Sequence, residues 1–384
     1  MIFFINFGRD PIQMKIETIA IHAGNHNDES SKAVIQPITM STTFVREADG
    51  SFPAGYIYSR SSNPNRAALE NVLAKLEGGV HAAAFSSGNA AGMSVFQTLK
   101  PGTHIIGPDD MYHGLRNQIK NLFADILEFD FVDINDPAVL AAHIKPNTGL
   151  ILVETPSNPL LKITDIKAIV ATARKHNIKV VCDNTFATPI GQQPLALGAD
   201  IVMHSSTKYF GGHSDLMGGA LITAEKSEWW SKIRQVQEMG GAIPSPMDCY
   251  YLTRSIKTLP YRVKGHVHNA QLLAEYLENH PKIERVMYPG LLSHPQHTTA
   301  RAQMLNFGGM LSFCVKGGSD EARKVINKLK IFTQATSLGG VESLIEHRAS
   351  VEGPDTKTPH NLLRVSVGLE HIDDLIADLT QALD

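Results

Sequence analysis

Apolar residues along the chain follow two spacings, one typical of amphipathic helices and one typical of buried strands. The helical spacing i, i+3, i+4 and i+7 appears after Asn63-Pro64 and is ended by Gly78-Gly79. Its apolar face consists of Leu69, Val72, Leu73 and Leu76. Similar spacing predicts helices at residues 165–176, 266–279 and 319–329, a longer polar helix around Trp229-Trp230, and a last helix from about residue 372.

Short apolar runs between these helices predict strands, and the run at 150–154 is expected to be buried on both faces. They fall at residues 104–106, 150–154, 179–182, 201–203, 218–223, 310–315 and 362–367. Helix 165–176, with Thr164 as its expected N-cap, separates two of the runs, and this strand–helix–strand order predicts parallel strands with crossover helices. Because ligands bind at the carboxyl ends of such strands, we expect a site near Asn158, Asp183 and Lys208.

Breaks in the pattern divide the chain into three parts. A glycine and proline cluster at residues 240–246 indicates a change of course and places a domain boundary near residue 255. Residues 63–255 are therefore predicted to form one domain and residues 256–384 a second, smaller α/β domain. Residues 14–62 show few helix signals, so we expect them to lie on another surface. Residues 1–13 are interpreted as a disordered extension or a misassigned start.

Composition narrows the functional classes. The 384 residues carry a net charge of −3, which provides no general field for nucleic acid or an acidic membrane. No apolar run approaches the length of a membrane span. Three widely spaced cysteines fit neither a disulfide framework nor a metal site and favour a reducing compartment, the cytoplasm. The histidines, His204 and His213 included, form no recognisable metal-binding set and are interpreted as ordinary polar residues.

The most informative chemistry lies in residues 183–219. Ser205 and Thr207 precede Lys208, and glycines follow it. Hydroxyl groups can bind a phosphate, while a lysine amine can form an imine with an aldehyde. Asp183 ends a neighbouring strand and could face a pyridinium nitrogen. This combination suits a carbonyl cofactor that carries a phosphate.

Two further stretches are consistent with bound anions. Ser87-Gly88-Asn89 opens a helix, where free backbone N–H groups and the helix dipole favour a phosphate. Arg364 lies inside the apolar strand 362–367, where a guanidinium is costly unless it meets an anion. Each stretch taken alone also has an ordinary structural explanation.

The order of these motifs over residues 14–384 resembles the pyridoxal-phosphate enzymes of cysteine and methionine metabolism. That family includes cystathionine β-lyase, γ-lyase and γ-synthase and methionine γ-lyase. The resemblance implies pyridoxal 5′-phosphate as the cofactor. It also implies an α/β fold of type I, similar to aspartate aminotransferase, with a mostly parallel central sheet.

The resemblance assigns roles to individual residues. Lys208 is expected to hold the cofactor and act as the base, and Asp183 to face the ring nitrogen. Tyr112 is expected to stack on the ring, contact the substrate and assist the departure of its sulfur. Asn158 is expected to bind the phenolic oxygen, and Ser87, Gly88, Asn89, Ser205 and Thr207 the phosphate. Asn89 departs from the usual S-S-G-M-A motif, but only its backbone N–H is needed.

Substrate binding and assembly follow from the same resemblance. Arg364 matches the arginine that holds the substrate's α-carboxylate, and Ser337 the serine that positions the lysine. The motif Tyr58-Ser59-Arg60 matches an arm that completes the neighbouring subunit's phosphate site. The predicted assembly is a homo-oligomer, a tetramer built as a dimer of dimers, acting on an amino acid without nucleic acid or membrane partners.

The choice of reaction rests on departures from the family pattern. Thr336 stands where enzymes acting through Cγ usually carry glutamate, and Asn117 where they tend to carry arginine, with Arg116 one place earlier. Gly114 replaces the cysteine usual in methionine γ-lyases. These differences favour cleavage of L-cystathionine at Cβ. Cystathionine γ-lyase and γ-synthase remain as alternatives, and a non-catalytic homologue is disfavoured because Lys208, Asp183 and Arg364 are all present.

Overall fold

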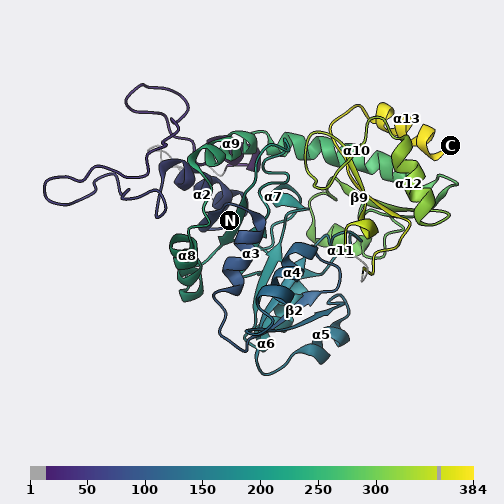
Figure 1. The fold of residues 1–384 in the computed structure, drawn as a ribbon, viewed down its shortest axis with the longest axis horizontal. Coiled ribbons are helices and arrows are strands. Elements are labelled where there is room, and N and C mark those ends of the chain that lie inside the picture. Colours follow the sequence, from purple (N-terminus) through teal and green to yellow (C-terminus); the bar gives the residue numbers. More distant parts are fainter. Residues whose placement is uncertain (1–13, 353–355) are drawn as a thin grey trace.

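A computed structural model describes residues 14–352 and 356–384. Residues 1–13, interpreted from sequence as an extension or a misassigned start, lie outside the described part. The larger of two sheets has the strand order β1-β7-β6-β5-β4-β2-β3 (Figure 1). Its strands are β1 (His81–Phe85), β2 (His104–Pro108), β3 (Glu128–Val132), β4 (Thr148–Glu154), β5 (Lys179–Asp183), β6 (Ile201–His204) and β7 (Gly219–Thr223).

The large sheet is mostly parallel, as predicted. Strands β3, β2, β4, β5 and β6 pair in parallel, and β7 runs antiparallel to both β6 and β1. In register, Glu154 at the end of β4 lies beside Asp183 at the end of β5. The carboxyl ends of the parallel strands therefore bring polar groups to one edge of the sheet, where the connecting loops can build a site.

Helices accompany this sheet in chain order. They are α2 (Pro64–Leu76), α3 (Gly88–Phe96), α4 (His113–Leu122), α5 (Pro137–His143), α6 (Ile166–Lys175), α7 (Thr188–Gly191), α8 (Glu228–Gly240) and α9 (Pro246–Ile256). The predicted apolar face of α2 is fully buried. The expected N-cap of α6 is wrong by one residue, because the Asp165 carboxylate, rather than Thr164, accepts the Ala168 N–H at 3.0 Å.

The second sheet belongs to the C-terminal part and has the order β10-β11-β12-β9-β8. Its strands are β8 (Ile283–Met287), β9 (Met310–Val315), β10 (Thr333–Gln334), β11 (Leu344–His347) and β12 (Leu362–Ser366). The helices are α10 (Leu259–Glu278), α11 (His297–Gln303), α12 (Ser319–Lys328) and α13 (Ile372–Leu383), with the short 3-10 turn η1 (Arg348–Ser350).

The long helix α10 leads from the large sheet to the C-terminal part (Figure 1). It begins at Leu259, seven residues before the helix predicted from sequence, because Leu259 and Val263 extend its buried face. Only Lys257 and Thr258 separate it from α9. The boundary expected near residue 255 falls at the end of α9, and the division into residues 63–255 and 256–384 stays a prediction.

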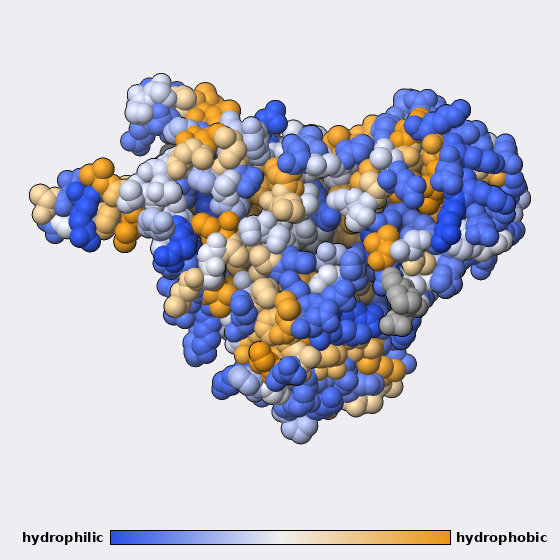
Figure 2. Space-filling model, in the orientation of Figure 1, coloured by the Kyte–Doolittle hydropathy of each residue, from blue (hydrophilic) through white to orange (hydrophobic). Residues whose placement is uncertain are grey.

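The N-terminal segment is the least packed of the described parts. It contains the helix α1 (Ile16–His22), which the sequence did not predict, and then an arm, residues 24–62, without helices or strands. The arm projects from the body as long loops that carry apolar side chains (Figures 1 and 2). Its exposed large apolar residues are Val34, Ile35, Met40, Val45, Ile57 and Tyr58.

Candidate active site

A cavity of about 490 Å³ lies where the carboxyl edge of the large sheet meets the C-terminal part. Twelve residues predicted from sequence line it: Ser87, Gly88, Asn89, Tyr112, Asn158, Asp183, Ser205, Thr207, Lys208, Thr336, Ser337 and Arg364. The structure therefore brings together side chains that are up to 277 positions apart in the sequence, from Ser87 to Arg364. Tyr58 and Arg60 are the two predicted site residues that do not line it.

Lys208 lies within the cavity, and its Nζ donates a hydrogen bond to Ser337 Oγ at 2.8 Å. Burial, followed by the positive charge of Arg364, lowers the pKa of Lys208 to about 8. Ser337 has a φ of 111°, a conformation that residues with a side chain rarely adopt and that is often found at functional sites. A larger fraction of this amine is thus neutral near pH 8 than in an ordinary lysine, as a nucleophile or base requires.

The first turn of α3 faces the loop before Lys208. Ser87 caps the helix by accepting the Ala90 N–H at 3.1 Å, and the next N–H groups belong to Gly88 and Asn89. An α-helix leaves such N–H groups without an internal acceptor, so they can bind an anion. A Cβ on Gly88 would lie 2.8 Å from the Ser205 Cβ, so only glycine permits this close approach.

Asp183 lies at the other side of the cavity, at the end of β5. Its Oδ1 accepts hydrogen bonds from the Thr185 N–H at 2.9 Å and the Thr185 hydroxyl at 2.5 Å. Burial raises the pKa of Asp183, and the Thr185 hydrogen bonds oppose that rise. A positively charged partner would therefore stabilise the carboxylate strongly. Behind it, the buried His204 Nε2 contacts Glu77 Oε1 at 2.5 Å.

Tyr112 stands at the start of α4. Its backbone N–H donates to Glu154 Oε2 at 2.8 Å, which ties the start of the helix to the end of β4. A Cβ on Gly114 would lie 2.6 Å from the Tyr112 hydroxyl oxygen, so the absence of a side chain leaves room for the ring. Burial raises the pKa of Tyr112, which keeps its phenol protonated at neutral pH.

Arg364 lies in the middle of β12 and is 4% exposed. Its Nη1 donates to Asn158 Oδ1 at 3.0 Å, and its Nη2 donates to the Ser337 carbonyl at 3.1 Å and to Glu346 Oε2 at 2.8 Å. These contacts connect the large sheet to the C-terminal part across the cavity. The ion pair with Glu346 gives the buried Arg364 an acidic partner, and it coexists with a position on the cavity wall.

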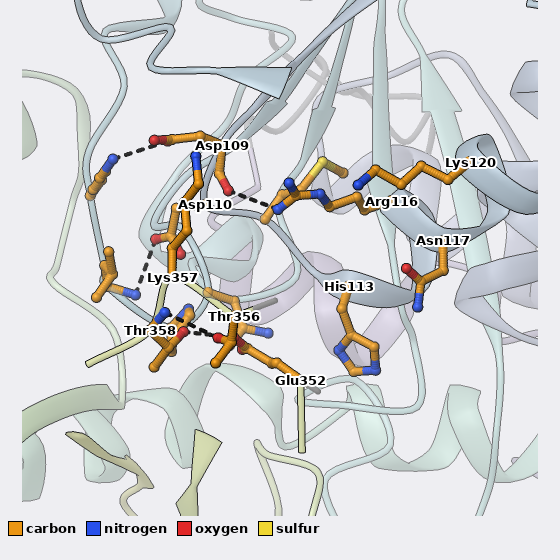
Figure 3. A pocket seen from close by; sticks show the side chains of 15 residues that line it. Asp109, Asp110, His113, Arg116, Asn117, Lys120, Glu352, Thr356, Lys357 and Thr358 are labelled. Atoms are coloured by element: carbon orange, nitrogen blue, oxygen red, sulfur yellow. Dashed lines mark hydrogen bonds and ion pairs between the residues drawn. The ribbon is translucent and has the colours of Figure 1, made fainter. Parts of the chain in front are cut away.

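A smaller polar pocket of about 220 Å³ adjoins the cavity and shares His113 and Asn158 with it. Arg116 and Asn117 line this pocket and not the cavity (Figure 3). The Arg116 guanidinium donates to the Asp109 carbonyl at 3.2 Å and lies 5.0 Å from the centre of the Phe131 ring. Neither side chain therefore supplies a positive charge to the cavity wall.

Tyr58 and Arg60 lie on the arm, outside the cavity. Tyr58 is 45% exposed, and Arg60 donates to the Glu238 carbonyl of α8 at 2.9 Å. The Arg60 guanidinium lies 5.8 Å from the centre of the Tyr58 ring, so the two side chains are neighbours. Their predicted role in another subunit is not tested by a single chain and stays a prediction.

Sequence reasoning missed nine residues that line the cavity: His113, Glu154, Thr185, Phe186, Met203, Met217, Leu338, Arg348 and Val351. Glu154 could have been found, since it ends a predicted strand in the same way as Asp183 does. Arg348 gave no usable signal because it belongs to a three-residue turn, η1, that follows an unpredicted strand.

The cavity suits a phosphate-bearing pyridine aldehyde such as pyridoxal phosphate. The start of α3, with Ser205 packed against Gly88, forms a cradle for a phosphate. Lys208 provides an amine with a lowered pKa, and the buried Asp183 provides a carboxylate that calls for a cationic partner. These three groups match the phosphate, the aldehyde and the ring nitrogen of that cofactor.

Two other functional classes receive no support from the described residues. Within residues 14–352 and 356–384, no group of three or more His, Cys, Asp or Glu side chains could hold a metal ion. None of the helices found there is both long and apolar enough to cross a membrane.

Comparison with known proteins gives consistent similarities. The family model described as Cys/Met metabolism PLP-dependent enzyme matches residues 17–384. A cystathionine gamma-synthase from Mycobacterium leprae is 46% identical over 376 residues, which cover 96% of this chain and 97% of that protein. A cystathionine beta-lyase from Coxiella burnetii is 44% identical over 378 residues, covering 96% and 97%.

Solved structures give the same result. The cystathionine gamma-lyase from Lactobacillus plantarum, complexed with L-serine, superimposes with a TM-score of 0.92. It is 41% identical, and the match covers 96% of this chain and 98% of that one. Similar proteins thus carry three different names at nearly equal identity, so similarity alone does not choose among the three reactions.

Proposed function

The chain belongs to the Cys/Met metabolism PLP-dependent enzymes, and from this premise we propose that it is a carbon–sulfur lyase that cleaves L-cystathionine at Cβ. With one water consumed, the products would be homocysteine, pyruvate and ammonia. The main support for a catalytic function is the hydrogen bond of 2.8 Å between Lys208 Nζ and Ser337 Oγ. It lies in a cavity that Asp183 and Arg364 also line.

The cofactor is pyridoxal phosphate, which supplies a conjugated ring that accepts electrons released at the substrate's Cα. In this proposal, Gly88, Asn89, Ser205 and Thr207 bind the phosphate. Asp183 keeps the ring nitrogen protonated by opposing its charge. Tyr112 stacks on the ring, and Asn158 donates its amide N–H to the phenolic oxygen while its Oδ1 accepts from Arg364.

Substrate binding and proton transfer are assigned to residues from both parts of the chain. Arg364 binds the α-carboxylate, since among the described residues three of its five N–H groups are committed and two are left. Lys208 removes the proton from Cα as a general base, and Ser337 positions its Nζ. A sulfur on Cβ can leave after this proton transfer, whereas a sulfur on Cγ needs a second one.

The preference for Cβ rests on the cavity wall around residue 336. Thr336 is neutral, and its hydroxyl donates to Glu346 Oε1 at 2.7 Å. A cationic side chain from α4 is also missing, because Arg116 lines the adjoining pocket. The wall therefore lacks the two charges expected to grip the distal end of a substrate in a γ-type reaction. The names of the relatives support γ-cleavage and γ-replacement as the second candidates.

Incubation of the purified, cofactor-loaded protein with L-cystathionine tests the proposal. Pyruvate as the main keto acid supports cleavage at Cβ, whereas mainly 2-oxobutyrate would assign a γ-lyase. If no keto acid forms, but an O-acyl-homoserine and cysteine yield cystathionine, the enzyme is a γ-synthase. Release of pyruvate from L-cystine at a slower rate is also expected, because the uncharged Thr336 and the lack of a cation from α4 should leave discrimination between distal groups weak.

We also propose that the arm completes the site of a second copy. The support is the position of Tyr58 and Arg60, which are neighbours on a projecting segment and lie outside their own chain's cavity. The apolar side chains exposed along the arm would be covered in such an assembly. A dimer is the minimum that this arrangement needs, and a dimer of dimers is the expected assembly.

A further inference from the structure

One carboxylate oxygen in the C-terminal part is shared by two arginines. Glu346 Oε2 accepts from Arg364 Nη2 at 2.8 Å and from Arg348 Nη1 at 2.8 Å. All three side chains are at most 6% exposed. Glu346 lies directly opposite Arg364 in the pairing of β11 with β12, so the backbone register alone brings these two together.

The two arginines differ in how many of their N–H groups are committed. Arg348 uses Nε and Nη2 to reach Glu352 Oε1, at 3.2 and 3.0 Å, and Nη2 also lies 3.3 Å from His113 Nδ1. With the bond to Glu346, four of its five N–H groups have partners among the described residues. Arg364 has two left. Arg348 therefore supports the site, while Arg364 is the guanidinium that can receive a ligand.

We propose that Arg348 is a positioning residue for carboxylate recognition, because it holds Glu346 and so prevents Glu346 from neutralising Arg364. This inference rests on the proposed role of Arg364 as the anchor of the substrate's α-carboxylate. A carboxylate and a guanidinium prefer a pair of parallel hydrogen bonds. Without Arg348, the Glu346 carboxylate would be free to turn toward Arg364 and form this pair, competing with the substrate.

Two further observations support the view that Glu346 is held by several partners and does not pair with Arg364 alone. The Thr336 hydroxyl donates to Glu346 Oε1 at 2.7 Å. Arg364 therefore contacts only the other carboxylate oxygen, Oε2, which it shares with Arg348. Burial raises the pKa of Glu346, but the arginines outweigh burial and hold that pKa below its ordinary value, which keeps the carboxylate ionised. His113 and Glu352, which face one side of Arg348, also line the adjoining pocket (Figure 3).

The test compares binding of L-alanine and L-alaninamide, which differ in the carboxylate, to the cofactor-loaded protein. Binding is followed by absorbance of the bound cofactor and by calorimetry, with no turnover required. For Arg348→Gln, we expect the Kd of L-alanine to rise at least about tenfold. The Kd of L-alaninamide should change little, because it presents no carboxylate to Arg364.

The double variant Glu346→Gln/Arg348→Gln provides the sharpest contrast. It removes the competing carboxylate together with the arginine, so L-alanine binding should recover most of the loss. A general loss of structure would instead be larger in the double variant. Arg348→Lys keeps the positive charge and should stay within a few-fold of wild type, and Arg323→Gln on the surface of α12 serves as the matched control.

Equal loss for L-alanine and L-alaninamide, no loss in Arg348→Gln, or a double variant weaker than the single would each overturn the inference. The outcome is separable from that of the proposed function. A wild-type protein that favours L-alanine over L-alaninamide but forms no keto acid from cystathionine refutes the reaction alone. If Arg348→Gln does not retain cofactor, the Arg348→Lys and double variants still decide the question.

Discussion

The wall of the cavity and the N-terminal arm differ in how firmly contacts within this chain hold their side chains in place. In the wall, Arg364 is buried and bonded to Asn158, Ser337 and Glu346, from both parts of the chain. On the arm, Tyr58 is 45% exposed, and the Arg60 guanidinium reaches the body through the Glu238 carbonyl. Strand ends and cross-strand pairs hold the first set in place, whereas the second set lies on loops.

This difference shows that local sequence signals carry different information in the two regions. A polar residue that ends a buried strand is placed by the sheet, so its position relative to other strand ends follows from topology. A polar residue on an unpacked arm has no such constraint, and its function depends on a surface that it meets later. Experiments on the wall should therefore act within one chain, and experiments on the arm should act between chains.

The largest effect within one chain should come from Lys208. Lys208→Ala removes the amine proposed to hold the cofactor and to move the proton, so keto-acid release should fall at least about a thousandfold. Circular dichroism should be unchanged, because the variant removes a buried amine whose charged form is disfavoured by its surroundings. In wild type, borohydride should attach the cofactor to Lys208. Recovery of the label on another lysine would overturn the assignment, and Lys162→Ala is the control.

The strand-end residues were the part of the site that the sequence could predict. Asp183, Asn158 and Lys208 follow continuous apolar runs, so their positions at one edge of the sheet follow from the strand pattern. The cradle at Gly88 was also predictable, since glycine and serine open a helix there. Boundaries were less predictable, as the early start of α10 illustrates.

The pairing of Glu346 with Arg364 could not have been predicted in the same way. Glu346 lies in the short strand Leu344–His347, where its charge does not stand out from the neighbouring polar residues. Glu346 meets Arg364 because of the antiparallel register of β11 with β12, and it meets Arg348 because of the turn that follows β11. Both are products of tertiary pairing, which a pattern of apolar positions does not determine.

The second effect concerns the pH dependence of Lys208. Because burial and Arg364 lower its pKa to about 8, the neutral amine becomes abundant between pH 6 and 8 and little more is gained above that range. Covalent capture of added pyridoxal phosphate by the cofactor-free protein should therefore rise about fiftyfold from pH 6 to pH 8, then level off. Stopped-flow absorbance measures the rate. A rate that keeps rising to pH 10 would indicate an ordinary lysine.

A third experiment tests whether Arg60 of the arm acts in the cavity of a second subunit. Arg60→Ala should weaken cofactor binding at least about tenfold, the lower end of the worth of a charged hydrogen bond, because the proposed phosphate site of the partner loses an arginine. Co-expression of Arg60→Ala and Lys208→Ala subunits should then restore about a quarter of wild-type activity, since half of the dimers are mixed and each has one intact site.

Arg46→Ala, another arginine of the arm, is the matched control and should leave cofactor binding unchanged. If the mixed sample is no more active than either variant alone, Arg60 acts within its own chain or not at all. A fully active monomer in sedimentation would exclude the shared site. The same mixing of two wall variants, Lys208→Ala with Arg364→Ala, should restore nothing when both residues belong to one cavity.

The smallest effect, and the finest test of the wall, concerns Thr336. A carboxylate at this position would lie beside Glu346, whose Oε1 now accepts the Thr336 hydroxyl, and the repulsion should turn it toward the distal end of the substrate. We expect Thr336→Glu to shift the product ratio a few-fold toward 2-oxobutyrate, because only a fraction of the about 1.5–3 kcal/mol that a charged contact to the substrate's distal amino group is worth distinguishes the two reactions. Thr336→Gln has nearly the same size without the charge and should keep the wild-type ratio. An equal shift in both variants would mean that volume, rather than charge, sets the choice between Cβ and Cγ.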